Sequence, residues 1–456
     1  MATSTVSERF LTEVVGPLAG REARDEAERC FYCYEAPCIR GCPTHIDVPV
    51  FIHQIATGDV AAAARTILAS NILGASCARI CPTEALCEGA CVRRAERPVS
   101  IGRLQRYATD HVMAHGMPGL PRLPERAIGG RTVAVVGAGP AGLGAAATLA
   151  RMGYPVTVYD ARERGGGLDT YGIVDYREPT PVSLAEVEWV ASLGVRFQFG
   201  VHVGADVTWE DLRREYDAVV MAIGLGRVPP LHIPGEDLPG VWDALDLVEA
   251  TKTGPPDAVS IGARVAVIGA GNTAVDAATC AKRLGAEDVT IYYRRGEAAM
   301  PAYAYEYTFA KQEGIQYRWW TTPVAIVGQG RVEGLRVVRT RPVEPASAAR
   351  RDAVLESVPG TEVTVPVDAV IRAIGQDKRR EAFQSVGVAI VAGRVQVDPD
   401  TYETTVSGVY AVGDALARPG EATVVQAVED GKQAAFAIHR KFASPPAASA
   451  SEQGRQ

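Results

Sequence analysis

Short runs of consecutive apolar residues recur along the chain after residue 130, and a glycine-rich turn follows two of them. Val133–Val136 and Val265–Ile268 are such runs, and each leads through glycines into an alanine-rich stretch of helical composition. A second β-branched run follows each helical stretch, at Val156–Tyr159 and at Val289–Tyr292. Continuous apolar runs are typical of strands that are buried on both faces of a parallel sheet. The pattern therefore predicts an α/β protein with two βαβ units.

The N-terminal part of the chain has a different pattern, which sets it apart as a domain of its own. Eight of the nine cysteines lie between Cys30 and Cys91. The segment 116–130 is dense in proline and glycine, which do not continue a helix, so we interpret it as a linker. We therefore expect a mainly helical domain over 1–115, ahead of the two βαβ units. The segment 444–456 is rich in Ser, Ala, Pro and Gln and is expected to be a disordered tail.

Composition and charge exclude several classes of partner. Of the 456 residues, 47% are hydrophobic and 22% are charged, as in ordinary globular proteins. The formal net charge is -7 and there is no Lys/Arg block, so we expect no nucleic-acid partner. No window approaches the roughly 18 apolar residues of a spanning helix, and the start of the chain lacks an apolar signal region. We therefore expect a cytoplasmic protein without a membrane partner, in which clustered cysteines are more often metal ligands than disulfides.

The first glycine turn has the pattern of a dinucleotide-binding site. Gly137 permits the tight bend, Gly139 lets the backbone approach a pyrophosphate, and Gly142 lets the helix pack closely on the strand. Asp160 ends the second strand, where an acid accepts hydrogen bonds from ribose hydroxyls. The residues expected at this site are Gly137, Gly139, Pro140, Ala141, Gly142 and Asp160. A structural βα turn without a ligand is the alternative interpretation.

The second glycine turn differs at the position that would contact the ribose. Gly269 and Gly271 repeat the glycines, but the position of the acid holds Tyr293, followed by Arg294 and Arg295. Guanidinium groups bind phosphate through paired N–H donors, so this pair predicts a 2'-phosphate and hence NADPH, with NADH as the alternative. A solvated arginine pair after a strand is the other interpretation.

A third motif, near the end of the chain, suggests how the two units are connected. Gly408–Ala415 (GVYAVGDA) is strand-like, and 423–435 has the composition of a helix. This pattern resembles the Rossmann-like, two-dinucleotide flavoproteins related to glutathione reductase, in which the aspartate matching Asp414, after Gly413, binds FAD near its ribityl and pyrophosphate groups. The resemblance implies an NAD(P)-binding domain over 256–365, inserted between two parts of an FAD-binding domain over 131–255 and 366–443.

One feature of that flavoprotein group is missing from this chain. A disulfide reductase of the group carries a redox-active cysteine pair beside its flavin, whereas Cys280 is the single cysteine after the N-terminal domain. We expect Cys280 to be a small buried hydrophobic residue. Electrons from the flavin must therefore leave by another route.

The N-terminal cysteines have the spacing of iron–sulfur ligands. They form two groups, Cys30-x2-Cys33-x4-Cys38-x3-Cys42-Pro43 and Cys77-x3-Cys81-Pro82-x4-Cys87-x3-Cys91. A Cys-Pro pair that closes such a run is familiar from bacterial ferredoxins. Two structural zinc sites are the alternative, but zinc is redox-silent and would give the electrons no exit. Counting alone would make all eight cysteines ligands of two 4Fe-4S clusters.

Three motifs in this domain resemble one enzyme family. Cys30–Pro43, Asn71–Cys87 and Pro98–Gln105 are similar to the flavin and iron–sulfur subunit of bacterial NAD(P)-dependent dihydropyrimidine dehydrogenase. They are also similar to the N-terminal half of the single-chain mammalian enzyme and, more distantly, to the glutamate synthase small subunit. The similarity extends over about residues 25 to 440.

The resemblance implies a specific set of ligands and contacts. One cluster would be held by Cys30, Cys33, Cys38 and Cys91, and the other by Cys42, Cys81, Cys87 and the amide oxygen of Gln105. Cys77 would then be a bystander. FAD would be contacted by Asp160–Leu168, which includes Gly167 and Leu168, and by Arg177, and the nicotinamide coenzyme by Asn272, Thr273, Arg294 and Arg295. Where the family often has Ile-Pro-Gln-Phe-Arg, this chain has Ile173–Arg177 (IVDYR), which leaves the flavin contacts there open.

The resemblance also implies a function. The chain would be an NAD(P)H-oxidising electron-input subunit that passes a hydride from NADPH to FAD and then single electrons through two 4Fe-4S clusters. Its partner would be an FMN and iron–sulfur catalytic subunit that reduces uracil and thymine to their 5,6-dihydro forms, in a heterotetramer. The alternatives are a glutamate synthase small subunit, an NAD(P)H:ferredoxin-type reductase, and a zinc-stabilised, flavin-free scaffold. No catalytic residue for pyrimidine chemistry is assigned to this chain.

Overall fold

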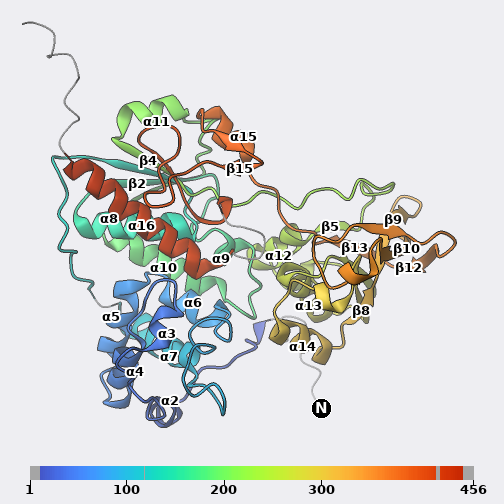
Figure 1. Ribbon diagram of the computed structural model, residues 1–456, viewed down its shortest axis with the longest axis horizontal. Helices are drawn as coiled ribbons and strands as arrows, with labels where there is room; N and C mark the ends of the chain where they lie inside the picture. Colours follow the sequence, from blue (N-terminus) through green and yellow to red (C-terminus); the bar gives the residue numbers. More distant parts are fainter. Residues whose placement is uncertain (1–10, 118, 417–421, 445–456) are drawn as a thin grey trace, which may run out of the picture. The chain divides into compact units, whose positions relative to one another are not determined.

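The apolar runs of the sequence become the inner strands of two parallel sheets (Figure 1). The computed structural model describes residues 11–117, 119–416 and 422–444. The predicted disordered tail over 444–456 lies outside these residues except at its first position. The described chain divides into two compact units, each of which is described by itself. The larger unit contains Pro17–Gly166, Leu184–Gly224 and the described chain after Lys378. The inserted unit contains Gly167–Ser183 and Leu225–Lys378, together with the described residues up to Gly16.

The large unit begins with the short helices of the cysteine-rich domain, as predicted. Polar side chains begin two of them, because Asp47 accepts a hydrogen bond from the Val50 N–H (3.3 Å) and Asp59 accepts one from the Ala62 N–H (3.0 Å). The helices are α2 (Gly20–Ala27), α3 (Pro37–Arg40), α4 (Val48–Ala56), α5 (Val60–Ser70), α6 (Gly74–Ile80) and α7 (Ile101–His115).

The first parallel sheet belongs to the same unit. Its strand order is β16-β4-β1-β2-β3, with all neighbours parallel. The strands are β1 (Val133–Val136), β2 (Val156–Asp160), β3 (Arg196–Phe199), β4 (Ala218–Met221) and β16 (Val409–Ala411). The helices around it are α8 (Pro140–Met152), α10 (Thr180–Ser192), α11 (Trp209–Glu215), α15 (Arg380–Ser385) and α16 (Val424–Ala443). A small hairpin of β14 (Ile390–Val391) and β15 (Arg394–Val395) follows α15.

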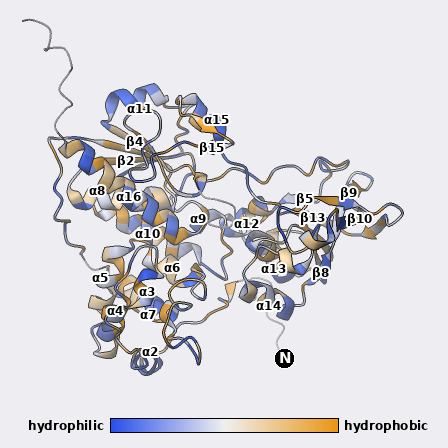
Figure 2. Cartoon of the chain, in the orientation of Figure 1, coloured by the Kyte–Doolittle hydropathy of each residue, from blue (hydrophilic) through white to orange (hydrophobic). Residues whose placement is uncertain are grey.

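Each face of the first sheet is buried against a different set of elements. Val133 and Val135 join the core that contains α8 and α16, whereas Ala134 and Val136 join the core that contains Trp209 of α11 and α15. The first of these cores continues without a break into the cysteine-rich domain. Figure 2 shows hydrophobic and hydrophilic residues mixed along α8 and α16, as expected for helices with one buried face. The cysteine-rich domain and the first sheet are thus one packed body.

The inserted unit repeats the first arrangement of strands. Its parallel sheet has the order β5-β13-β6-β7-β8, and α12 and α13 share a core with one face of this sheet. The opposite face packs on an antiparallel sheet of β9, β10, β11 and β12. The parallel strands are β5 (Val241–Asp243), β6 (Arg264–Ile268), β7 (Asp288–Tyr293), β8 (Gln316–Trp319) and β13 (Ala369–Arg372). The antiparallel strands are β9 (Thr321–Val327), β10 (Gly334–Pro342), β11 (Leu355–Ser357) and β12 (Val363–Pro366). The helices are α9 (Leu168–Tyr171), α12 (Ala244–Thr253), α13 (Asn272–Arg283) and α14 (Ala304–Gln312).

The structure draws the boundaries of the insertion more widely than the sequence suggested. The predicted boundaries were 255/256 and 365/366, whereas the inserted unit extends over 225–378 and takes in 167–183 as well. The physical reason is strand pairing, because β5 and β13 hydrogen-bond to each other and β13 pairs with β6. Both strands are short apolar runs, and their sequence does not reveal which sheet they join.

No single helix in the described residues is long and apolar enough to cross a membrane. One bent pair passes the test of length and composition, α5 with α6, which meet at 89°. Ile67 and Leu68 of this pair lie in the core of the large unit.

Candidate cofactor sites

The first glycine turn is held in a conformation that leaves little room for side chains. Gly137 has a φ of +108°, and a Cβ atom there would lie 2.3 Å from the Ala222 carbonyl oxygen. A Cβ atom at Gly142 would lie 1.9 Å from the Gly137 carbonyl oxygen. The roles predicted for the first and third glycines therefore follow from packing, and Gly139 precedes Pro140 as the N-terminal cap of α8.

Asp160 joins the turn from the end of β2. Its carboxylate accepts hydrogen bonds from the N–H groups of Ala138 (2.7 Å) and Arg162 (2.8 Å). The acid therefore lies beside the glycine turn, as an acid that binds a ribose must. The N-terminus of α8, with its unpaired N–H groups, lies in the same place and suits a pyrophosphate.

The C-terminal motif reaches the same helix end. A Cβ atom at Gly413, whose φ is +75°, would lie 2.8 Å from the Ala141 side chain. Asp414 follows, and burial together with the nearby Asp430 raises the pKa of its carboxyl to about 6. The structure therefore brings together the predicted residues from both parts of the chain, although about 270 positions separate them in sequence.

The other predicted flavin contacts lie in the inserted unit. Gly167 has a φ of +58° and precedes Leu168, the first residue of α9. Arg177 is partly buried and belongs to an ionic network, in which its Nη1 lies 3.0 Å from Asp276 and its Nη2 2.9 Å from Glu306. The predicted contact of Arg177 with FAD stays a prediction, and its observed role is to join this segment to α13 and α14.

A buried lysine, which no sequence motif singled out, fixes the same segment. The Lys252 Nζ donates to the carbonyl oxygens of Asp169 (2.8 Å), Ile173 (2.6 Å) and Glu178 (3.0 Å). Burial lowers the pKa of Lys252. One ammonium group thus holds the backbone of three residues around the Leu168–Arg177 stretch.

The second glycine turn repeats the geometry of the first. A Cβ atom at Gly269 would lie 2.1 Å from the Ala373 carbonyl oxygen, and Gly269 donates its N–H to the Tyr292 carbonyl (3.1 Å). A Cβ atom at Gly271 would make one ordinary van der Waals contact, 3.9 Å from the Pro301 side chain. Asn272 and Thr273 begin α13 directly after it. The predicted coenzyme residues therefore lie at a helix N-terminus.

The two arginines after β7 have different surroundings. Arg294 is exposed, whereas Arg295 is 8% exposed, and the Arg295 Nη2 lies 3.4 Å from the Ala353 carbonyl oxygen. Burial and the neighbouring Arg295 lower the pKa of Arg294. An anion near Arg294 would relieve this repulsion, so Arg294 is the better placed of the two to bind a 2'-phosphate.

One set of four cysteines lines a single pocket. Cys30, Cys33, Cys38 and Cys91 surround it together with Phe31 and Val92, which are exposed. Burial and the neighbouring thiols raise the pKa of Cys38 to about 11. Four thiolates so close together repel one another. Iron ions would offset this repulsion and stabilise the thiolate form. The pocket contains the four cysteines of the first implied cluster, whose ligation stays a prediction.

The other set is less open and lies around α6 and α7. Cys81 follows the last residue of α6, and Cys42 is buried. Burial raises the pKa of Cys87, and the nearby Glu88 and Cys42 raise it further. Gln105 is 7% exposed, and its Nε2 donates to the Gly74 carbonyl oxygen (2.7 Å). Its amide is therefore fixed by the first residue of α6, while Cys77 lies inside that helix and is 2% exposed.

No three His, Cys, Asp or Glu side chains in the described parts of the chain are grouped as ligands of one metal ion. Cys280, the remaining cysteine, is fully buried in α13, and burial raises its pKa to about 12. It packs as the small hydrophobic residue that the sequence predicted.

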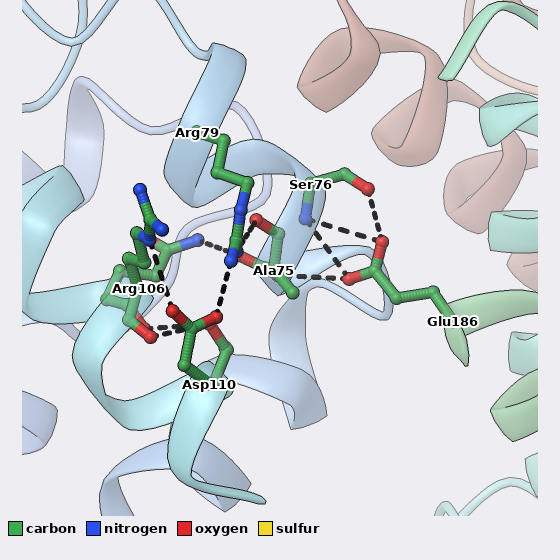
Figure 3. A network of polar contacts seen from close by, with 9 residues as sticks. Ala75, Ser76, Arg79, Arg106, Asp110 and Glu186 are labelled. Carbon is green, nitrogen blue, oxygen red and sulfur yellow. Dashed lines mark hydrogen bonds and ion pairs between the residues drawn. The ribbon is translucent and has the colours of Figure 1, made fainter. Parts of the chain in front are cut away.

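Two charged residues that the sequence did not single out join the cysteine-rich domain to the sheet. Lys432 of α16 donates to the carbonyl oxygens of Thr44 and Ser70 (3.2 Å each). Glu186 of α10 accepts hydrogen bonds from α6 (Figure 3). The sequence pattern could have indicated that Glu186 is buried, because it lies four residues from both Val182 and Val190 and so shares an apolar helix face with them.

Comparison with known families assigns both parts of the chain. A family model described as dihydropyrimidine dehydrogenase domain II, 4Fe-4S cluster, matches residues 7–117. A second, described as pyridine nucleotide-disulphide oxidoreductase, matches residues 131–431. The two matches meet at the predicted linker.

Curated proteins of several kinds are similar to almost the whole chain, and two examples show the range. A glutamate synthase [NADPH] small chain from Halomonas elongata is 37% identical over 93% of this chain and 92% of its own length. The NAD-dependent dihydropyrimidine dehydrogenase subunit PreT from Escherichia coli strain K12 is 35% identical over 95% of this chain and 97% of its own length.

Solved structures support the fold. FprA from Mycobacterium tuberculosis in complex with NADPH has a TM-score of 0.54 and 22% identity, and the match covers 68% of this chain and 84% of that one. A thioredoxin reductase from T. acidophilum has a TM-score of 0.54 and 23% identity over 68% of this chain and 98% of its own. The two-sheet arrangement predicted from the glycine motifs is therefore confirmed.

The different burial of the two arginines predicts different effects of removing them. Arg294→Ala should lower kcat/KM for NADPH by about 10- to 100-fold, the value of one or two charge-assisted hydrogen bonds, and leave kcat/KM for NADH nearly unchanged. Arg295→Ala should mainly lower thermal stability. Steady-state kinetics with a dye acceptor measures both coenzymes, and Arg336→Ala, exposed on β10, is the matched control. An unchanged NADPH to NADH ratio in Arg294→Ala would contradict the assignment.

The ligand of the second cluster can be decided by two substitutions. Gln105→Ala should lose or alter one of two clusters, and with it up to about half of the bound iron, whereas Cys77→Ala should retain both. Iron and sulfide analysis of anaerobically purified protein measures this, with Cys280→Ala as the control. If Cys77→Ala alone loses a cluster, the implied ligand scheme is wrong.

The buried carboxyl of Glu306 predicts a pH dependence of stability. Burial raises its pKa from 4.5 to about 7. A carboxyl that holds its proton more tightly in the folded state makes the protein less stable as the pH rises from about 4.5 to 7. Relative to Glu306→Gln, the wild type should therefore lose about 1 to 3 kcal/mol of stability between pH 5 and pH 8. Thermal unfolding at the two pH values checks this. Glu287→Gln, which is exposed, should show no such change, and a parallel pH response of Glu306→Gln and wild type would refute the shift.

Proposed function

Because the chain belongs to the pyridine nucleotide-disulphide oxidoreductase family and carries a 4Fe-4S domain before that region, we propose that it feeds electrons to a pyrimidine-reducing partner. The chain itself is an NAD(P)H-dependent FAD and iron–sulfur oxidoreductase that acts as an electron-input subunit. The finer proposal adds an FMN and iron–sulfur catalytic subunit, which converts uracil or thymine to the 5,6-dihydro form. Two copies of each chain would form a heterotetramer in the cytoplasm, where thiols stay reduced.

The observation that carries the pyrimidine assignment is the environment of Gln105. The motif Gly102–Gln105 distinguishes the resemblance to dihydropyrimidine dehydrogenase, and in the structure its glutamine is buried with its amide held by the Gly74 carbonyl (2.7 Å). When the Nε2 group of a buried amide is held in this way, its oxygen has a fixed orientation and is suited to bind the iron of a cluster. This supports a second cluster between Cys42, Cys81, Cys87 and Gln105.

The bound cofactors would supply the chemistry, namely hydride transfer from NAD(P)H to FAD and single-electron transfer through the iron–sulfur clusters. The residues of the chain bind and orient them. The α8 N-terminus with Asp160 and Asp414 would hold FAD, and the α13 N-terminus with Arg294 would hold the nicotinamide coenzyme. We place NADPH ahead of NADH because Arg294 is exposed directly after β7, the strand that pairs with β6 ahead of the second turn.

The surroundings of the two cysteine sets support an order for the clusters. Lys432 of α16 binds the Thr44 carbonyl, two residues after Cys42, so the second set lies next to the flavin-type sheet. The first set lines a pocket whose Phe31 and Val92 are exposed. We therefore propose that electrons pass from the flavin to the second set and leave through the first.

A second candidate has its own support. The glutamate synthase [NADPH] small chain is 37% identical to this chain over 92% of its length. That function needs the same electron-input chemistry but a different partner. The partner therefore decides between the two.

The first experiment identifies that partner. We expect an anaerobic pull-down of the native protein to co-purify an FMN-binding chain, and the complex to reduce uracil with NADPH. Mass spectrometry and the loss of uracil absorbance measure the two results. A large glutamine-hydrolysing partner without uracil turnover would overturn the pyrimidine proposal and support the second candidate.

A pair of matched variants tests the proposed exit. Cys38→Ala should abolish uracil turnover by the complex but leave NADPH oxidation by a two-electron dye unchanged, because the flavin is untouched. Cys280→Ala, a change of the same size in α13, should keep both activities. Full uracil turnover in Cys38→Ala would refute electron exit through the first set.

A further inference from the structure

A fully buried carboxylate connects the first sheet's helices to the cysteine-rich domain. Glu186 of α10 is 0% exposed. Its oxygens accept hydrogen bonds from the Ala75 N–H (2.7 Å), the Ser76 N–H (3.3 Å) and the Ser76 Oγ (2.5 Å). Figure 3 shows Glu186 reaching across to the first turn of α6 from a separate helix. About 110 positions of sequence separate the partners, so this contact exists only in the folded protein.

The helix that Glu186 holds carries the second cysteine set. Gly74, the first residue of α6, accepts the hydrogen bond from Gln105 Nε2, and Cys81 directly follows the last residue of the helix. The Cys81 N–H donates to the Cys77 carbonyl (3.1 Å), so the end of the helix is fixed relative to its start. A helix of seven residues is about 10 Å long and behaves as one rigid piece. Whatever fixes its first turn therefore also fixes two of the four proposed ligands.

Glu186 binds the first turn of α6 from outside the cysteine-rich domain. The other contacts of α6 in Figure 3 lie within the cysteine-rich domain. Arg79 donates hydrogen bonds to the Ala75 carbonyl (3.2 Å) and to Asp110 of α7 (2.7 Å). Arg106, beside Gln105, binds the second oxygen of Asp110 (3.1 Å). The Arg79–Asp110–Arg106 network thus joins α6 to α7, whereas Glu186 joins α6 to α10.

We propose that Glu186 is a positioning residue of the second cluster, acting through α6 on Cys81 and, through the Gly74 carbonyl, on Gln105. This role rests on the proposed ligand scheme. Glu186 sets the distance between the first sheet and the cluster, and its negative charge disfavours the addition of an electron nearby. A carboxylate can accept three donors at once, whereas an amide has one acceptor oxygen and would leave at least one donor unpaired.

The test measures the clusters themselves in the full-length, anaerobically purified chain. The variants are Glu186→Gln, Glu186→Ala and, as the matched control, Glu188→Gln, which makes the same change at an exposed position of the same helix. Redox titration followed by electron paramagnetic resonance gives the signal and reduction potential of each cluster. Iron analysis and dye reduction by NADPH report cluster content and the flavin.

We expect Glu186→Gln to keep both clusters, change the signal of one and move its potential upward, with the other cluster and the flavin unchanged. Glu186→Ala should bind that cluster about 10- to 100-fold more weakly, as is typical when a group that orients a ligand is removed. Glu188→Gln should match the wild type.

Three results would overturn the proposal, and they are distinguishable. A wild-type protein with two clusters whose signals and potentials are identical in Glu186→Gln would refute the role of Glu186 alone. A wild-type protein that holds a single cluster would refute the ligand scheme and this role with it. Equal changes at both clusters and the flavin would mark Glu186 as a general stabilising residue, which also contradicts the proposal.

Discussion

The backbone contact between α8 and α16 is the packing constraint on which the candidate flavin site depends. A Cβ atom at Gly144 would lie 2.6 Å from the Val428 carbonyl oxygen, and one at Gly431 would lie 2.0 Å from the Ala141 carbonyl oxygen. The two helices therefore touch through glycines, with no room for a side chain between them. Because α16 follows the Gly413 motif closely in sequence, this contact brings the motif against the N-terminus of α8.

A charged side chain next to this contact reaches the cysteine-rich domain. Lys432 follows Gly431 directly, and its ammonium group reaches the carbonyls of Thr44 and Ser70. Glu186, which lies on a different helix, α10, accepts hydrogen bonds from the N–H groups of α6. One cation thus binds free carbonyl oxygens and one anion binds free N–H groups, which satisfies buried backbone atoms as well as the charges. Hydrogen bonds of this kind restrict the position of the cysteine-rich domain relative to the first sheet more than apolar packing does, because apolar packing tolerates small shifts.

The sequence predicted the features that depend on local backbone geometry. The glycines, the buried strands and the two-sheet fold could be recognised because a turn with a φ above zero admits few other residues. It did not predict which sheet β5 and β13 join, because pairing is decided by partners more than 100 residues away. Nor did it separate exposed Arg294 from buried Arg295, since both follow the same strand and only the fold around Ala353 distinguishes them.

The cysteine sets show the same division between local pattern and long-range contact. Spacing groups Cys30 with Cys42 and Cys77 with Cys91, but the pocket contains Cys91 together with Cys30 and not Cys42. A ligand set that crosses between the two runs closes the chain from residue 30 to residue 91 into a loop. Metal binding would then stabilise this domain as a cross-link does, because it restricts the unfolded chain more than two separate four-residue sites would. A ligand set that combines Cys91 with Cys30 therefore implies that the clusters hold the small helices of this domain in place as much as its apolar core does.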